Sequence, residues 1–190
     1  MAKKRRTLVL GISGSPRKGG NTDVLVQEVL KGAKKAGART QFVNVAGLKI
    51  SPCVACYHCA KHNGKCAIKD DMQRLYAMLK RSDVWVFGTP VYWFHVSAQL
   101  KAPMDRMFAF IFDKSEPMKG KRAAVVTTSG DADVREMARH IWGSFATASK
   151  FTGVKLAGRL AVQGVNKEDA RKRWTGFKRA QRLGVKLARC

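Results

Sequence analysis

Residues 11–22, with the sequence GISGSPRKGGNT, have the composition and the position expected of a phosphate-binding loop. They follow the apolar run 7–12, which predicts a buried strand, and they precede a helical pattern of apolar residues that begins at Val24. Asn21 and Thr22 are expected to cap this helix. Because the free amides at a helix start and the positive end of the helix dipole favour an anion, this order predicts a phosphate site.

The sequence of this loop also narrows the kind of phosphate ligand. The loop does not end in Gly-Lys-Ser/Thr, as a Walker A motif does, and it is not Gly-x-Gly-x-x-Gly. A hydroxyl-lined loop of this length suits one terminal phosphate better than a pyrophosphate, which indicates a mononucleotide such as FMN. A flexible glycine-rich turn without a ligand is the alternative, but strand, loop and helix start fall in the order that binding requires.

A second segment that could bind a metal contains four of the five cysteines, in the spacing C-x2-C-x2-C-x6-C. These candidate metal ligands are Cys53, Cys56, Cys59 and Cys66. The first three match the start of a ferredoxin-type run that wraps a [4Fe–4S] cluster, although the fourth spacing is longer and no proline follows it. A zinc site that includes His58 or His62 is one alternative. Cysteines without any metal are the other.

The elements that must position these segments alternate between strand-like and helix-like patterns along the whole chain. Strands are expected at residues 7–12, 40–45, 83–89, 122–128 and 155–162. Helices are expected between them, including one that Asp70 and Asp71 open, one at about 96–110 that Pro103 interrupts, and a last one capped by Asn166. This alternation predicts an α/β fold, a flavodoxin-like three-layer sandwich with a five-stranded parallel sheet of order 2-1-3-4-5. Its ligand should lie at the carboxyl ends of the strands, near the switch between strands one and three.

Two further loops should meet the phosphate loop at that edge of the sheet. The third strand runs into residues 89–94, whose aromatic rings and backbone amides suit the faces and edge of a flavin ring. The alternative is that these rings only cap the sheet or fill a dimer contact. The fourth strand ends in the small-residue loop 127–131, in which Ser129 and Gly130 are expected to approach the ring or the ribityl chain.

These motifs together resemble the NAD(P)H-dependent FMN reductase family. The resemblance rests on residues 14–22, 70–72 and 89–93 and on Lys101, Asp105 and Arg106, and it runs from about residue 7 to residue 128. The cysteine run is similar to that of the iron–sulfur flavoprotein branch. The resemblance implies that this chain forms a homodimer or homotetramer with the flavin near a subunit boundary. Lys101, Asp105 and Arg106 are expected to be structural rather than catalytic, because Lys101 and Asp105 lie one helical turn apart and can pair. The residues expected to bind FMN are then Ser13, Ser15, Pro16, Arg17, Asn21, Thr22, Pro90, Val91, Tyr92, Trp93, Ser129 and Gly130.

Length and composition bound the remaining possibilities. A chain of 190 residues with 45% hydrophobic residues predicts one domain, residues 1–190, with the cysteine-rich loop at about 50–69. No apolar run is long enough to cross a bilayer, and the basic start is followed by too short an apolar stretch for a signal peptide, so a cytoplasmic protein is expected. The net charge of +24 raises the local concentration of anionic partners without choosing among them.

The leading functional hypothesis is an FMN-dependent oxidoreductase that passes electrons from NAD(P)H or a reduced carrier to a small acceptor, such as a quinone, a flavin or an oxidant. No side chain stands out as an acid or base, as expected where the cofactor carries the chemistry. The alternative is an electron carrier that links protein partners, with an acidic ferredoxin-like donor attracted by the basic surface. Nucleic-acid binding is a third and less favoured interpretation.

Overall fold

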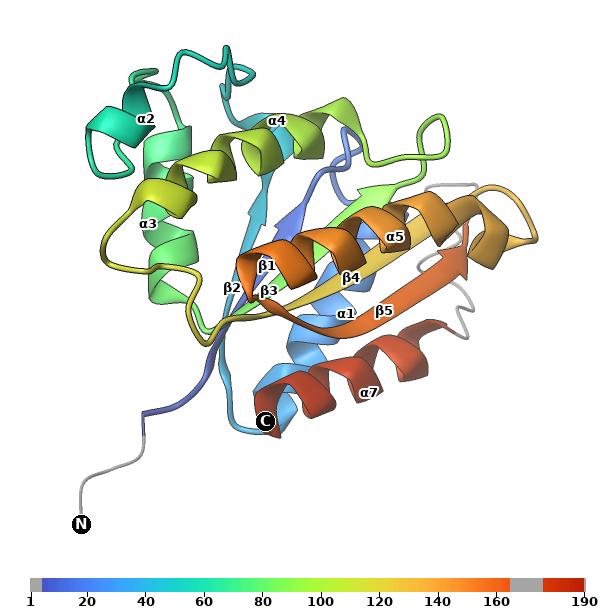
Figure 1. The fold of residues 1–190 in the computed structure, drawn as a ribbon. Helices are drawn as coiled ribbons and strands as arrows, with labels where there is room; N and C mark the ends of the chain where they lie inside the picture. The colour runs from blue at the N-terminus through green and yellow to red at the C-terminus, as the bar shows by residue number, and fades with distance from the viewer. Residues whose placement is uncertain (1–4, 165–175, 190) are drawn as a thin grey trace.

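The computed structural model describes residues 5–164 and 176–189, and its five strands form one parallel sheet of order β2-β1-β3-β4-β5 (Figure 1). Every neighbouring pair of strands is parallel, with the register Gly11 opposite Phe42 in β2 and opposite Val86 in β3. This topology confirms the predicted flavodoxin-like order. The strands are β1 (Leu8–Ser13), β2 (Arg39–Asn44), β3 (Val84–Pro90), β4 (Arg122–Ser129) and β5 (Lys155–Gln163).

Helices cover both faces of this sheet and complete three layers (Figure 1). One face carries α1 (Asn21–Lys35) and α7 (Gly176–Arg189), whose apolar residues pack with Val9, Val86 and Val126 of the central strands. The opposite face carries α3 (Met72–Arg81), α4 (Ala98–Arg106) and α5 (Val134–Thr152). Three shorter helical segments are η1 (Val45–Gly47), α2 (His58–Lys61) and η2 (Met107–Phe112).

Close packing between α1 and α7 depends on glycine. A Cβ atom added at Gly184 of α7 would meet the carbonyl oxygen of Val29 at 1.9 Å, and one added at Gly32 of α1 would meet the carbonyl oxygen of Gln181 at 2.1 Å. Two helix backbones therefore touch where neither residue has a side chain. Because α7 lies this close to α1, its apolar side reaches the same face of the sheet, where Ala180 and Leu187 share a core with Val9 and Val86. The predicted apolar stripe of the last helix therefore covers the sheet.

Three local expectations differ from the structure. Gly20, not Asn21 or Thr22, is the N-cap of α1, and those two residues form its first turn. The helix expected at 96–110 is split, because α4 ends at Arg106 and continues as the 3-10 segment η2, whereas Pro103 lies inside α4. The expected cap Asn166 lies outside the described residues. Among the residues that the structure describes, no helix is long and apolar enough to cross a membrane.

Candidate functional site

A pocket opens at the carboxyl ends of β1, β3 and β4, where the phosphate loop, the aromatic loop and the β4 loop meet. The residues that line it are Ser15, Arg17, Gly20, Asn21, Thr22, Pro90, Val91, Tyr92, Thr128, Ser129, Gly130 and Gly164. Most of the predicted FMN residues therefore surround one cavity, although segments more than 100 positions apart supply them. Three of them, Ser13, Pro16 and Trp93, are not among the lining residues.

The phosphate loop is held in a tight curve by its own hydroxyl groups. The Ser15 amide donates to Ser13 Oγ at 3.3 Å, and the Arg17 amide donates to Ser15 Oγ at 3.2 Å. The Gly14 amide bonds to the carbonyl of Gly88 in β3 at 2.8 Å, so the loop starts fixed to the neighbouring strand. Buried Ser13 thus shapes the loop from behind instead of facing the cavity.

Two residues that the sequence analysis missed brace this loop from the side. Asp23 in the first turn of α1 accepts a hydrogen bond from the Gly19 amide at 2.8 Å. Asn44, at the end of β2, donates to Asp23 Oδ1 and to the carbonyl of Ser15, both at 3.0 Å. Asp23 is buried, and its partners are backbone and amide groups that β2 and the loop bring together. Only the tertiary structure shows this bracing, because Asn44 lies 21 positions from Asp23.

The inner wall of the pocket presents polar groups that can bind an anion. The first hydrogen bond of α1 runs from the Val24 amide to the Gly20 carbonyl at 3.1 Å, so the preceding first-turn amides have no acceptor within the helix. Thr22 Oγ1 and Thr128 Oγ1 form a buried hydrogen bond of 2.8 Å, which joins the first turn of α1 to the end of β4 at the pocket wall. The buried Asn21 Oδ1 has no hydrogen-bond partner among the described residues. Because rotation of the amide exchanges its oxygen and nitrogen, Asn21 can offer an N–H donor here, and the site fits a phosphate.

The aromatic loop forms a tight turn at the rim. Tyr92 and His95 exchange backbone hydrogen bonds of 2.9 and 3.0 Å, and the two residues between them, Trp93 and Phe94, have φ values of 47° and 61°. Large side chains seldom adopt this left-handed conformation, which costs conformational energy. The turn leaves Trp93 93% exposed, whereas Tyr92 lines the pocket. A contact of Trp93 with a flavin therefore stays a prediction.

The cysteine-rich loop runs from η1 to α3 at the same end of the sheet as the pocket (Figure 1). Cys53 and Cys56 are exposed, whereas Cys59 and Cys66 are half-buried, and all four are free thiols. Burial, together with the nearby Cys66 and Cys53, raises the pKa of the Cys59 thiol. Over residues 5–164 and 176–189, no three His, Cys, Asp or Glu side chains converge closely enough to hold a metal ion.

A buried arginine, Arg106, holds the two ends of this loop together. Arg106 of α4 pairs with Asp70 through Nη1 at 2.9 Å and Nη2 at 3.2 Å, and its side chain is 1% exposed. The same guanidinium donates to the carbonyl of Ser51 before the first cysteine, at 2.9 Å, and to the carbonyl of Ile68 after the last, at 3.2 Å. We call Arg106, Asp70 and these two carbonyls the loop clamp. The prediction that Arg106 is structural is consistent with this position.

Asp70 and Asp71 lie at the start of α3, as predicted: Asp71 is its N-cap position, and Asp70 Oδ1 accepts from the Met72 amide at 3.0 Å. Burial alone raises the pKa of the Asp70 carboxyl, but hydrogen bonds from Arg106 and from the amides of Ser51 and Met72 outweigh it and hold the pKa below its usual range. Asp71 accepts from the Lys49 amide at 2.8 Å. Both carboxylates therefore fasten the cysteine loop to the body of the protein.

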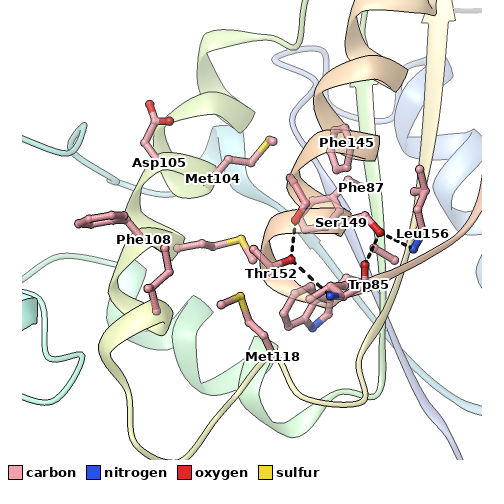
Figure 2. Close-up of a pocket in the computed structure, with 15 residues that line it drawn as sticks. Trp85, Phe87, Met104, Asp105, Phe108, Met118, Phe145, Ser149, Thr152 and Leu156 are labelled. Carbon is pink, nitrogen blue, oxygen red and sulfur yellow. Dashed lines mark hydrogen bonds between the residues drawn. The ribbon is translucent and has the colours of Figure 1, made fainter.

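A second cavity lies on the α4–α5 face, where Trp85, Phe87 and Phe145 form its floor (Figure 2). Its two hydroxyl groups are satisfied internally, because Ser149 donates to the Val154 carbonyl and Thr152 to the Ala148 carbonyl. Figure 2 shows these bonds directed along the wall rather than into the space. With mainly apolar walls, this cavity lacks the donors that a phosphate needs, and the first pocket is the candidate site.

A doubly wound α/β sheet with a pocket at its switch point is typical of a flavodoxin-like protein, and comparison with known proteins gives the family. Residues 7–155 match the profile of the NADPH-dependent FMN reductase family, and the chain belongs to that family. Its curated relatives include an iron–sulfur flavoprotein of Archaeoglobus fulgidus, 44% identical over 124 residues that cover 65% of this chain and 63% of the relative. Another from the same organism is 31% identical over 94% of this chain and 78% of its own length.

An iron–sulfur flavoprotein of Methanocaldococcus jannaschii is 46% identical over 98 residues, which cover 52% of this chain and 50% of the relative. The chain thus spans about half to two thirds of the length of several relatives that it matches. These relatives confirm the predicted iron–sulfur flavoprotein branch.

Solved structures confirm the fold. An NAD(P)H:quinone oxidoreductase from Methanothermobacter marburgensis superposes with a TM-score of 0.73 at 16% identity, over 96% of this chain and 98% of that one. An FMN-dependent NADH-azoreductase from Bacillus anthracis, solved in complex with FMN, gives a TM-score of 0.65 at 14% identity, over 96% of this chain and all of that one.

Proposed function

We propose that this chain binds FMN in the candidate pocket and works as a flavin-dependent oxidoreductase. The observation that carries the proposal is the inner wall of the pocket, where the first-turn residues Asn21 and Thr22 line one cavity and the buried Asn21 Oδ1 has no hydrogen-bond partner among the described residues. The phosphate would lie against this wall, with Arg17 adding positive charge at the entrance. Pro90, Val91 and Tyr92 would contact the ring, and Ser129 and Gly130 would contact the ring or the ribityl chain.

The bound FMN would supply hydride and electron transfer, and the residues of the chain would bind and orient it. Among the described residues that line the pocket, none is an aspartate, glutamate, histidine, lysine or cysteine. The protein therefore contributes position and electrostatic field, while NAD(P)H or a reduced carrier is the proposed donor and a small oxidant the proposed acceptor.

The cysteine loop is proposed to hold a [4Fe–4S] cluster. The chemistry of its donor set supports this, because four thiols lie within 14 residues in ferredoxin-like spacing, and the loop clamp fixes both ends of the segment. Arg106 would also place a positive charge near the negatively charged cluster. With both cofactors present, an electron carrier between protein partners becomes the second candidate function, favoured by the net charge of +24, which suits an acidic donor.

The double variant Ser15→Ala/Thr22→Ala tests the proposed FMN site. Each hydroxyl bond to a charged phosphate is worth about 1.5–3 kcal/mol, so the affinity for FMN should fall at least roughly tenfold. Fluorescence titration of FMN into the apoprotein measures this. The control Ser144→Ala/Thr147→Ala removes the same two hydroxyls from α5, away from the pocket, and should bind as the unaltered protein does. Equal affinity of both double variants would show that the phosphate binds elsewhere.

Steady-state oxidation of NAD(P)H with a quinone distinguishes the two functions. Multiple turnovers without any protein partner support the oxidoreductase. An FMN-loaded protein that is reduced rapidly by a reduced ferredoxin, but not by NAD(P)H, would support the carrier.

A further inference from the structure

A third cavity, of about 630 Å³, wraps around the open edge of the sheet at β5. Its wall includes Arg135 and Trp142 from α5, Arg159 from β5 and Arg179 from α7. Among residues 5–164 and 176–189, no residue lines both this cavity and the candidate FMN pocket. The three arginines are exposed and come from three different elements, so the fold, rather than a run of basic residues in the sequence, brings them to one cavity.

These three arginines have no carboxylate partner. Within residues 5–164 and 176–189, Arg5, Arg106 and Arg139 each form an ion pair, whereas Arg135, Arg159 and Arg179 form none. The acidic residues Asp133 and Glu136 at the start of α5 form other contacts, because Asp133 accepts from the Glu136 amide and Glu136 pairs with Arg139. The cavity therefore concentrates positive charge that the described protein does not neutralise.

Trp142 gives an independent indication of a ligand. Its Nε1 atom is buried and has no hydrogen-bond acceptor among the described residues. A buried polar group without a partner destabilises the folded state, and an acceptor supplied by a ligand would remove that cost. The guanidinium of Arg159 stacks over the same indole, with Cζ 5.1 Å from the ring centroid, so its plane is already oriented.

We propose that this cavity binds the phosphate groups of a small phosphorylated molecule. Guanidinium groups donate paired hydrogen bonds to phosphate oxygens, and the first turn of α5, at Val134 and Arg135, places the positive end of a helix dipole at the same wall. The cavity is much larger than one phosphate requires, which favours a diphosphate or a phosphorylated organic compound. The site is separate from the flavin chemistry and does not depend on it.

Isothermal titration calorimetry with inorganic pyrophosphate on the full chain tests this, with the fluorescence of Trp142 as a second readout. We expect saturable binding at one site, weakened about tenfold in Arg159→Gln and in Arg135→Gln. Trp142→Phe keeps an aromatic ring but removes the N–H donor, and it should also bind more weakly. The matched control is Arg182→Gln, which removes the same charge from an exposed position on α7 outside the cavity and should bind as the unaltered chain does.

Two results would overturn the proposal. Equal weakening in Arg182→Gln and Arg159→Gln would show general attraction to a basic surface. Loss of pyrophosphate binding in Ser15→Ala/Thr22→Ala would place the anion in the candidate FMN pocket instead. Because Arg135 is an exposed helix residue, Arg135→Gln keeps the test valid even if Arg159→Gln disturbs β5. FMN affinity should be unchanged in Arg135→Gln, so failure here and failure of the proposed function are distinguishable.

Discussion

The loop clamp should be among the most sensitive polar sites in the protein, and Asp70→Asn is the substitution that tests it. Asparagine has nearly the same shape as aspartate but no charge, so the guanidinium of Arg106 would stay buried without its counter-ion. Removing one partner of a buried ion pair costs about 3–5 kcal/mol of the free energy of unfolding. Because Arg106 is 1% exposed and Asp70 10% exposed, solvent offers little compensation. For a chain of this size, the loss corresponds to a midpoint temperature lower by about 6–20 °C.

The matched control lies in the same helix. Lys101 and Asp105 form an ion pair of 2.6 Å one turn apart, but their side chains are 48% and 44% exposed. Asp105→Asn removes the same charge by the same chemical change, yet exposed pairs contribute about 0–1 kcal/mol. Thermal unfolding of both variants, followed by circular dichroism, should therefore show a large loss for Asp70→Asn and a small one for Asp105→Asn. Similar losses for the two would refute the conclusion that burial of the clamp determines its importance.

The pH dependence of the free energy of unfolding tests whether Asp70 stabilises the protein through its charge. The pKa of the Asp70 carboxyl is lowered in the folded state, so its stabilising contribution is present above the unfolded value of about 4. That contribution is lost as the pH falls through the lower folded value. The gap in stability between the unaltered protein and Asp70→Asn should therefore be largest near neutral pH and shrink in strong acid, when measured by urea unfolding at each pH. A gap that does not change with pH would mean that Asp70 acts through shape alone.

Four further substitutions test other parts of the structure. Gly184→Ala places a Cβ 1.9 Å from the Val29 carbonyl and should lower the stability by at least about 1–3 kcal/mol in chemical unfolding, whereas Gly143→Ala in α5, with open space around it, should raise the stability by about 0.5–1 kcal/mol. Trp93→Ala should change the fluorescence of bound flavin or its rate of reduction if the exposed ring covers the cofactor, and an unchanged spectrum and rate would assign Trp93 a different role. Iron and sulfide analysis of the unaltered anaerobic protein should find about four of each per chain, and Cys56→Ser should lose them while FMN stays bound. Zinc in the unaltered protein would contradict the cluster.

Sequence patterns predicted the sheet and most of the pocket because their signals are local. Apolar runs indicated all five strands, and the parallel order followed from the alternation with helices. The loops at the carboxyl ends of β1, β3 and β4 then had to meet, which is why Ser15, Thr22 and Tyr92 line one cavity. Thr128 was missed, although it stood beside Ser129 in a loop already expected at that edge.

The sequence could not predict contacts between distant residues when neither residue belongs to a recognisable motif or periodic pattern. Asn44 looks like an ordinary strand end, yet its amide fixes both Asp23 and the backbone of Ser15. Trp93 stood in a motif suited to a flavin, but the backbone turn with positive φ directs it into solvent. The grouping of Arg135, Arg159 and Arg179 depends on how two helices flank an edge strand, which no spacing in the chain encodes.

The functional loops are held in place by the same kind of contact, in which a side chain from a distant element donates a hydrogen bond to a backbone carbonyl of the loop. Ser97 Oγ donates to the Gly14 carbonyl at 2.6 Å, Asn44 to Ser15, and Arg106 to both ends of the cysteine loop. Backbone carbonyls near a ligand site need partners, and irregular loops supply only some of them from within the loop, as Ser15 Oγ does for the Arg17 carbonyl. Side chains of the helices and strands provide these bonds, so the rigidity of the sheet is transmitted to loops that have little regular structure. The same dependence makes the loops sensitive to substitutions such as Asp70→Asn, which touch neither the pocket nor a cysteine.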